Sequence, residues 1–145
     1  MLFRSNANPG DEITVTVTMG PVEKVGTLQM VMDIPAGLSY VAGSGRLLTT
    51  KEAIGYDALD WTEVSKMING YASAGNYAST SDTVLGSYKV TVDDDASGNY
   101  TIGLTNLEFG DCATWEAITD EFYVTPATVT VGGSQEETEI GRAHV

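Results

Sequence analysis

The side chains best suited to catalysis are scarce, since the chain has one histidine, His144, and one cysteine, Cys112, beside twenty carboxylates. His144 lies in the closing stretch IGRAHV, which is the translation of ATCGGAAGAGCACACGTC and resembles a common sequencing adapter. We therefore predict that residues 140–145 are not native and that His144 has no function. Without it the chain cannot form a Ser/His/Asp triad, a Cys/His dyad or a histidine-ligated metal site. One cysteine forms neither an intrachain disulfide nor a Cys-rich zinc site, so the sequence predicts a protein that is not an enzyme.

The acidic run Asp93, Asp94 and Asp95, followed by Asn99, offers the oxygen ligands that calcium prefers. It lacks the spacing of an EF-hand loop and a closing bidentate glutamate. A solvated hairpin turn, in which Asp and Asn side chains satisfy backbone groups, explains the same residues. We favour the turn and expect no cofactor, with calcium as the alternative.

Aromatic side chains are the candidates for stacking on sugar rings. Tyr71 and Tyr77 lie in a stretch of small residues, NGYASAGNYASTSD, which we predict to be a loop. Exposed aromatics in such a loop would be unusual without a function. Trp115 is a third candidate, although for Trp115 and for Trp61 we favour packing in the core.

The formal net charge is −13, from twenty acidic and seven basic residues. This field repels nucleic-acid phosphates and anionic lipid surfaces, so neither is an expected partner. A solvated acidic surface is the interpretation we favour, and a basic partner or divalent cations are the alternatives. No apolar run approaches the ~20 residues of a membrane span, so we expect no membrane insertion.

Strand-type alternation dominates the chain. In EITVTVTM, Ile13, Val15 and Val17 fall on one face and the threonines on the other; residues 26–34 alternate in the same way. Further strands are predicted over residues 38–43, 60–68, 83–92 and 99–109, with a bulge near Thr105 and Asn106 and a final strand pair over 120–124 and 127–131. Residues 49–59 could hold one or two helical turns begun by Thr49 or Thr50. About eight or nine short strands predict an antiparallel β-sandwich of jelly-roll or Ig-like type.

Three stretches carry a family resemblance: NPGDEITVTVTM, VGTLQMVMDIPAGLSYVAGSG and TSDTVLGSYKVTVDDDASGNYTIGL. In composition, order and spacing they resemble cohesin domains, with Tyr88 at the aromatic position of the third block. The resemblance spans residues 8–131. The segment PAGLSYVAGSG also resembles a motif in repeated Ig-like stalk domains of bacterial surface proteins.

The resemblance implies a non-catalytic, monomeric module of a longer bacterial protein that is extracellular or on the cell surface, its signal peptide lost by truncation. Its partner would be a calcium-loaded dockerin domain in polysaccharide-degrading machinery; direct carbohydrate binding and a structural spacer are the alternatives. If a dockerin binds the exposed face of one sheet, two predicted strands offer Gln29, Val31, Asp33, Asp60, Thr62 and Lys66. Val31 among polar neighbours suits an interface, whereas partial cover on both sheet faces is an equal alternative.

Four segments follow from this interpretation. Residues 1–7 are the truncated start of the domain or a preceding linker, and residues 8–131 are the β-sandwich. Residues 132–139, GGSQEETE, have the composition of a flexible linker. Residues 140–145 are the stretch that we predict to be non-native.

Overall fold

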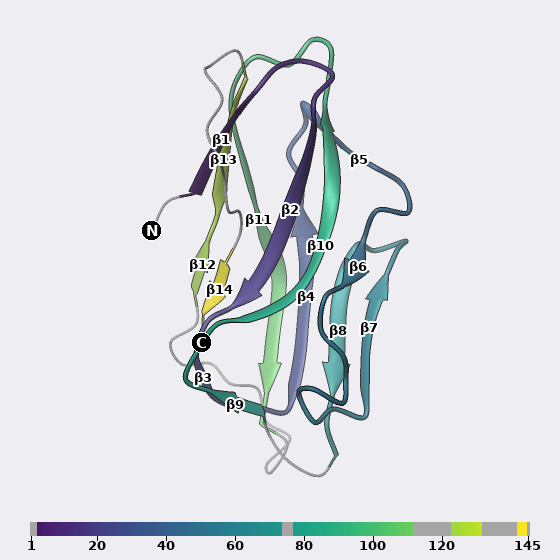
Figure 1. The fold of residues 1–145 in the computed structure, drawn as a ribbon, viewed down its shortest axis with the longest axis vertical. Coiled ribbons are helices and arrows are strands. Elements are labelled where there is room, and N and C mark those ends of the chain that lie inside the picture. Colours follow the sequence, from purple (N-terminus) through teal and green to yellow (C-terminus); the bar gives the residue numbers. More distant parts are fainter. Residues whose placement is uncertain (1–2, 74–76, 112–122, 132–141, 145) are drawn as a thin grey trace.

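The computed structural model describes residues 3–73, 77–111, 123–131 and 142–144, and over these residues the chain forms strands and turns without a helix. Figure 1 shows two large sheets packed against each other. The predicted all-β sandwich is therefore confirmed. Within the described ranges no helix is long and apolar enough to cross a membrane.

The first sheet has six strands in the order β1–β13–β11–β4–β8–β7. Their bounds are Phe3–Ala7 (β1), Ala127–Val131 (β13), Gly98–Gly110 (β11), Thr27–Asp33 (β4), Met67–Tyr71 (β8) and Ala58–Thr62 (β7). β1 pairs with β13 in parallel, and the other neighbours are antiparallel. Residues 3–7 thus belong to the sheet rather than to a separate linker.

The second sheet has the order β12–β14–β2–β10–β5, and β6 also pairs with β10. Its strands are Tyr123–Thr125 (β12), Arg142–His144 (β14), Glu12–Met19 (β2), Thr83–Val92 (β10), Leu38–Tyr40 (β5) and Arg46–Leu47 (β6). Val22–Val25 (β3) and Tyr77–Ser79 (β9) form a small separate pair. The described residues hold more strands than predicted because five of them have only two or three residues.

Alternation along the strands places the core between the sheets. On β2 the side chains of Val15, Val17 and Met19 are buried, and on β4 those of Leu28 and Met30 are buried. Each such side chain stabilises the fold by ~1.5–3 kcal/mol relative to its exposed state. The core from both sheets also includes the larger side chains Tyr88, Phe109, Ile68, Leu85 and Ile102.

The predicted bulge in β11 is confirmed. Pairing with β4 shifts register between Thr105 and Glu108, and Asn106 has a φ of 48°. The extra residue explains the shift of apolar positions from even to odd numbers along this strand.

The prediction of one strand over residues 60–68 is wrong. The chain turns at residues 63–66, and the Lys66 N–H donates to the Glu63 carbonyl at 3.3 Å while Lys66 takes a φ of 52°. The strands β7 and β8 are therefore antiparallel neighbours. The turn contains no Gly or Pro, so the residue pattern did not mark it.

The loop predicted over residues 69–82 is also corrected. Residues 69–71 complete β8, whose backbone pairs with β4 and β7, and Tyr77–Ser79 form β9. Small residues are compatible with strands when neighbouring strands supply the hydrogen bonds, and here they do.

Residues 49–57 form turns and bends instead of the helical turns predicted over residues 49–59, and Ala58 and Leu59 begin β7. The Thr50 hydroxyl accepts from the Ala53 N–H at 3.1 Å, as a helix cap would. The turn ends at Gly55, which has a φ of 71°, and the Tyr56 N–H closes back on the Lys51 carbonyl at 2.7 Å. These hydrogen bonds close a single turn on itself, so no helix extends from it.

The final strands exist but do not pair with each other. β12 joins the second sheet and β13 the first, and Pro126 stands between them. Proline has no N–H to donate to a ladder, which fits a crossing point between sheets.

β14 lies parallel to β2. Backbone pairing does not depend on side-chain identity, so the non-native origin of residues 140–145 stays a prediction. The linker predicted over residues 132–139 lies outside the described residues.

Candidate functional site

The outer side of the first sheet carries rows of side chains from four adjacent strands, β11, β4, β8 and β7. Cross-strand pairing defines a first row of Thr105, Val31, Met67 and Thr62. A second row contains Glu108, Gln29, Asn69 and Asp60, and further positions are Thr27, Tyr71, Ala58 and Asp33. We refer to these twelve residues as the outer face.

The outer face combines an apolar centre with acidic surroundings. Val31 and Met67 are half-buried, and Tyr71 is 49% exposed. Asp33, Asp60 and Glu108 are exposed, and the twelve residues include no lysine or arginine. Apolar anchors inside a polar rim are typical of protein interfaces. The charges favour a partner with basic groups.

Five of the six residues predicted for partner binding lie on the outer face: Gln29, Val31, Asp33, Asp60 and Thr62. Lys66 does not. It lies in the turn between β7 and β8, and its Nζ is 5.2 Å from the centroid of the Tyr40 ring. Lys66 is thereby directed towards the second sheet, in a cation–π contact.

Seven outer-face residues were not predicted to bind a partner: Met67, Asn69, Tyr71, Thr105, Glu108, Thr27 and Ala58. Among them, Tyr71 was predicted only as a sugar-stacking candidate. The first three of the seven were missed because β8 was not recognised as a separate strand. The alternation of Met67, Asn69 and Tyr71 with Ile68 and Gly70 was the available signal, since Ile68 is fully buried.

The aromatic candidates for sugar stacking do not gather in one place. Tyr71 stands on the outer face, and Tyr77 on β9 packs against the core, with its hydroxyl 2.7 Å from that of Thr83. Both tyrosines lie on strands, although the sequence predicted a loop at their positions. Trp115 lies outside the described residues. Trp61 packs against the core beside Tyr88, with ring centroids 6.3 Å apart.

Glu63 ties the two sheets together at the end where this aromatic cluster lies. Its carboxylate accepts from the Tyr40 hydroxyl at 2.6 Å, the Gly43 N–H at 2.7 Å and Trp61 Nε1 at 3.1 Å. These bonds, the one from Tyr40 first, lower the pKa of Glu63 below its ordinary value. Burial, and then the bond to Glu63, raises the pKa of Tyr40. We refer to the three hydrogen bonds to the Glu63 carboxylate as the Glu63 clamp.

The acidic run lies in the turn between β10 and β11. Asp93 accepts from the Ser39 hydroxyl at 2.5 Å, whereas the Asn99 side chain accepts from Thr130 at 2.8 Å. The two ends of the candidate calcium site thus bond to different strands. Among the described residues no three His, Cys, Asp or Glu side chains are grouped as metal ligands would be. Calcium binding by Asp93, Asp94, Asp95 and Asn99 stays an untested alternative.

Comparison with known families matches residues 3–131 to the cohesin domain. The chain belongs to the cohesin family. A comparison with curated proteins gives no significant match.

Solved structures resemble the fold at low sequence identity. A non-cellulosomal cohesin from the hyperthermophilic archaeon Archaeoglobus fulgidus has a TM-score of 0.58 and 17% identity, with 91% of each chain covered. The third ScaB cohesin of R. flavefaciens, in complex with a group 1 dockerin, has a TM-score of 0.60 and 14% identity, covering 90% of this chain and 92% of the other. A type I cohesin–dockerin complex from Clostridium thermocellum has a TM-score of 0.55 and 14% identity, with 90% of each chain covered. These similarities establish the fold.

Proposed function

We propose that this chain is a non-catalytic docking module that binds a dockerin domain through the outer face of β11, β4, β8 and β7. Membership of the cohesin family supports a binding role, and two structural neighbours are cohesins in complex with dockerins. An extracellular or cell-surface location and a place in polysaccharide-degrading machinery belong to the same proposal.

The observation that carries the proposal is the apolar pair at the centre of the outer face. Val31 and Met67 are directly paired across β4 and β8, and polar residues surround them. Covering such half-exposed apolar side chains with a partner gains free energy, and the polar rim supplies directional hydrogen bonds. A stalk spacer would need no such centre, so the outer face argues against the spacer alternative.

The charge of the outer face indicates what its partner should carry. Asp33, Asp60 and Glu108 offer exposed carboxylates, so a dockerin with lysine or arginine around an apolar anchor would be complementary. Because these charges are exposed, they should affect the association rate and its salt dependence more than the dissociation rate.

Substitution of Val31 by aspartate tests this proposal. Binding to a panel of calcium-loaded group 1 and type I dockerins would be measured by calorimetry for the wild type, Val31→Asp and the matched control Val84→Asp. Val84 is a 42% exposed valine on β10 of the other sheet, so its substitution adds the same charge elsewhere.

We expect Val31→Asp to weaken binding at least ~10-fold, as loss of an interface anchor does, and Val84→Asp to leave it unchanged. Equal effects of the two substitutions, or no binding to any dockerin of the panel, would refute the proposal. Thermal melts of both variants would establish that they are folded.

A further inference from the structure

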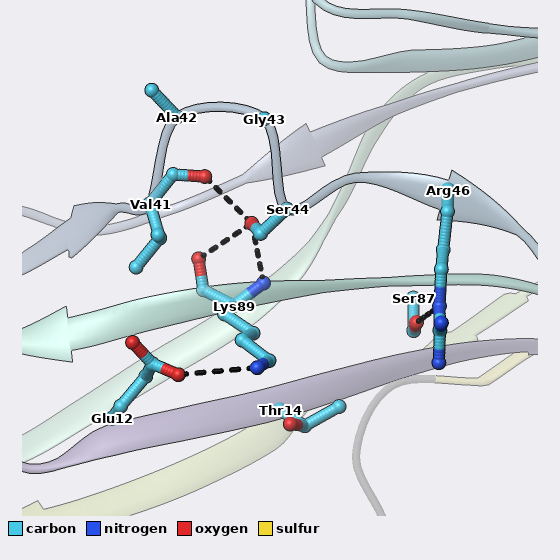
Figure 2. A pocket seen from close by; sticks show the side chains of 9 residues that line it. All are labelled: Glu12, Thr14, Val41, Ala42, Gly43, Ser44, Arg46, Ser87 and Lys89. Atoms are coloured by element: carbon cyan, nitrogen blue, oxygen red, sulfur yellow. Dashed lines mark hydrogen bonds and ion pairs between the residues drawn. The ribbon is translucent and has the colours of Figure 1, made fainter.

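A hollow lies on the opposite side of the sandwich from the outer face. It has a volume of about 380 Å³ and opens between strands β2 and β10, the loop of residues 41–44 and Arg46 on β6, on the outer side of the second sheet. Figure 2 shows Glu12 and Thr14 on β2, Lys89 on β10 and Arg46 on β6, with the Arg46 side chain directed towards Ser87. The size lies within the range of small-ligand sites.

The wall of this hollow is fixed in place by hydrogen bonds. The Ser44 hydroxyl donates to the Val41 carbonyl at 2.6 Å and accepts from the Lys89 N–H at 2.9 Å, which joins the loop to β10 (Figure 2). On the other side, the Gly43 N–H is held by Glu63 at 2.7 Å. A loop held at both sides is preorganised, which reduces the entropy lost when a ligand binds.

The hollow is locally positive in an acidic chain. Lys89 Nζ lies 3.2 Å from Glu12 Oε1, so these two charges balance each other. Arg46 contacts the Ser87 hydroxyl through Nε at 3.5 Å, and among the described residues no carboxylate pairs with its guanidinium. The lining residues thus keep one unbalanced positive charge, whereas the whole chain carries −13.

These groups define the chemistry of a ligand. One surplus positive charge suits a monoanion, and the planar guanidinium of Arg46 matches a carboxylate with two parallel hydrogen bonds. A phosphate monoester carries a charge of about −1.5 to −2, which exceeds the one unbalanced positive charge of the hollow. The hydroxyls of Thr14 and Ser87 can donate to or accept from ligand hydroxyls, and the Glu12 carboxylate can accept from them. A glutamate or aspartate side chain has no hydroxyl group to bond with them.

We propose that this hollow binds a uronic acid unit of an acidic polysaccharide, with its carboxylate on Arg46 and its hydroxyls on Thr14, Ser87 and Glu12. The site uses no aromatic stacking. It lies on the second sheet, away from the outer face of the first, so it would be occupied independently of a docked protein partner.

The test is a titration of the whole chain with trigalacturonic acid. Cellotriose is the control for an uncharged sugar, and a polyglutamate peptide is the control for an acidic ligand that is not a sugar. Arg46→Gln removes the side chain that is proposed to bind the ligand's carboxylate. Arg46→Lys keeps the positive charge but cannot form the two parallel hydrogen bonds of a guanidinium. Lys51→Gln is the control, because Lys51 is an exposed cation outside the hollow.

We expect saturable binding of trigalacturonic acid alone, at least ~10-fold weaker in Arg46→Gln, intermediate in Arg46→Lys and unchanged in Lys51→Gln. Absence of binding, or equal loss in Lys51→Gln, would overturn the proposal. Comparable binding of polyglutamate would overturn the assignment to a sugar. Arg46 is exposed, so a melt should show all variants folded, and dockerin binding should be unaffected by Arg46→Gln.

Discussion

Val31 on β4 and Met67 on β8 lie directly opposite each other on the outer side of the first sheet. Their strand neighbours Met30 and Ile68 are paired in the same way on the inner side and are fully buried. One pair of strands therefore supplies a core contact and a surface apolar centre at adjacent positions. This separation of faces allows stability and binding to be changed independently.

Two methionines give a matched test of that separation. Met30→Ala should destabilise the fold by about 2–5 kcal/mol, because it leaves a cavity in a closely packed core. Met67→Ala should cost less than about 1 kcal/mol, because its side chain is half-exposed on the outer face. Urea unfolding would measure both values. Similar losses in the two variants would mean that Met67 also belongs to the core.

The Glu63 clamp should make the stability dependent on pH. The pKa of Glu63 is lower in the folded chain than its ordinary value. The Glu63 carboxylate therefore stabilises the fold fully at a pH above its ordinary pKa, and this stabilisation is lost as the pH falls through the lower pKa of the folded chain. We expect the melting temperature to fall between about pH 5 and pH 3 more steeply in the wild type than in Glu63→Gln. Glu52→Gln, in an exposed turn, is the control and should follow the wild type. Parallel curves for all three proteins would contradict this assignment.

Tyr88 should tolerate loss of its hydroxyl. The hydroxyl is buried and has no hydrogen-bond partner among the described residues, and burial raises the pKa of Tyr88 well above its ordinary value. Tyr88→Phe removes a polar atom that costs free energy to bury and keeps the ring contact with Trp61. We expect the free energy of unfolding to stay within about 0.5 kcal/mol of the wild type or to rise. Tyr40→Phe, which breaks a bond of the clamp, should lower the melting temperature. A marked loss of stability in Tyr88→Phe would indicate a partner for its hydroxyl.

Calcium should leave the isolated chain unchanged. Asp93 is engaged by Ser39 and Asn99 by Thr130, so the acidic run is not arranged as one ligand set. We expect the same melting temperature in excess calcium and in EDTA. A rise with calcium that disappears in Asp93→Asn would support the alternative that the run is a cation site. Because dockerins are expected to carry calcium themselves, this test uses the chain alone.

The sequence predicted the features that depend on local periodicity. Alternation on β2 and β4 assigned inner and outer side chains correctly, and the shift of apolar positions located the bulge beside Asn106. The sequence-based prediction failed where pairing between strands determines the local structure. The turn at residues 63–66 contains no Gly or Pro, and the small residues 69–71 become a strand only because β4 and β7 lie beside them. That error hid the three outer-face residues of β8, Met67, Asn69 and Tyr71. The Glu63 clamp joins residues from distant strands, which no local pattern reveals.

The most direct test of the docking proposal follows the methionine methyl groups by NMR while a dockerin from the panel is added. Met67 stands on the outer face, whereas Met19, Met30 and Met32 are buried between the sheets and serve as internal controls. The account predicts that the Met67 methyl resonance shifts or broadens in a saturable manner while those of the three buried methionines stay in place. Saturable binding that leaves the Met67 resonance unchanged would contradict it.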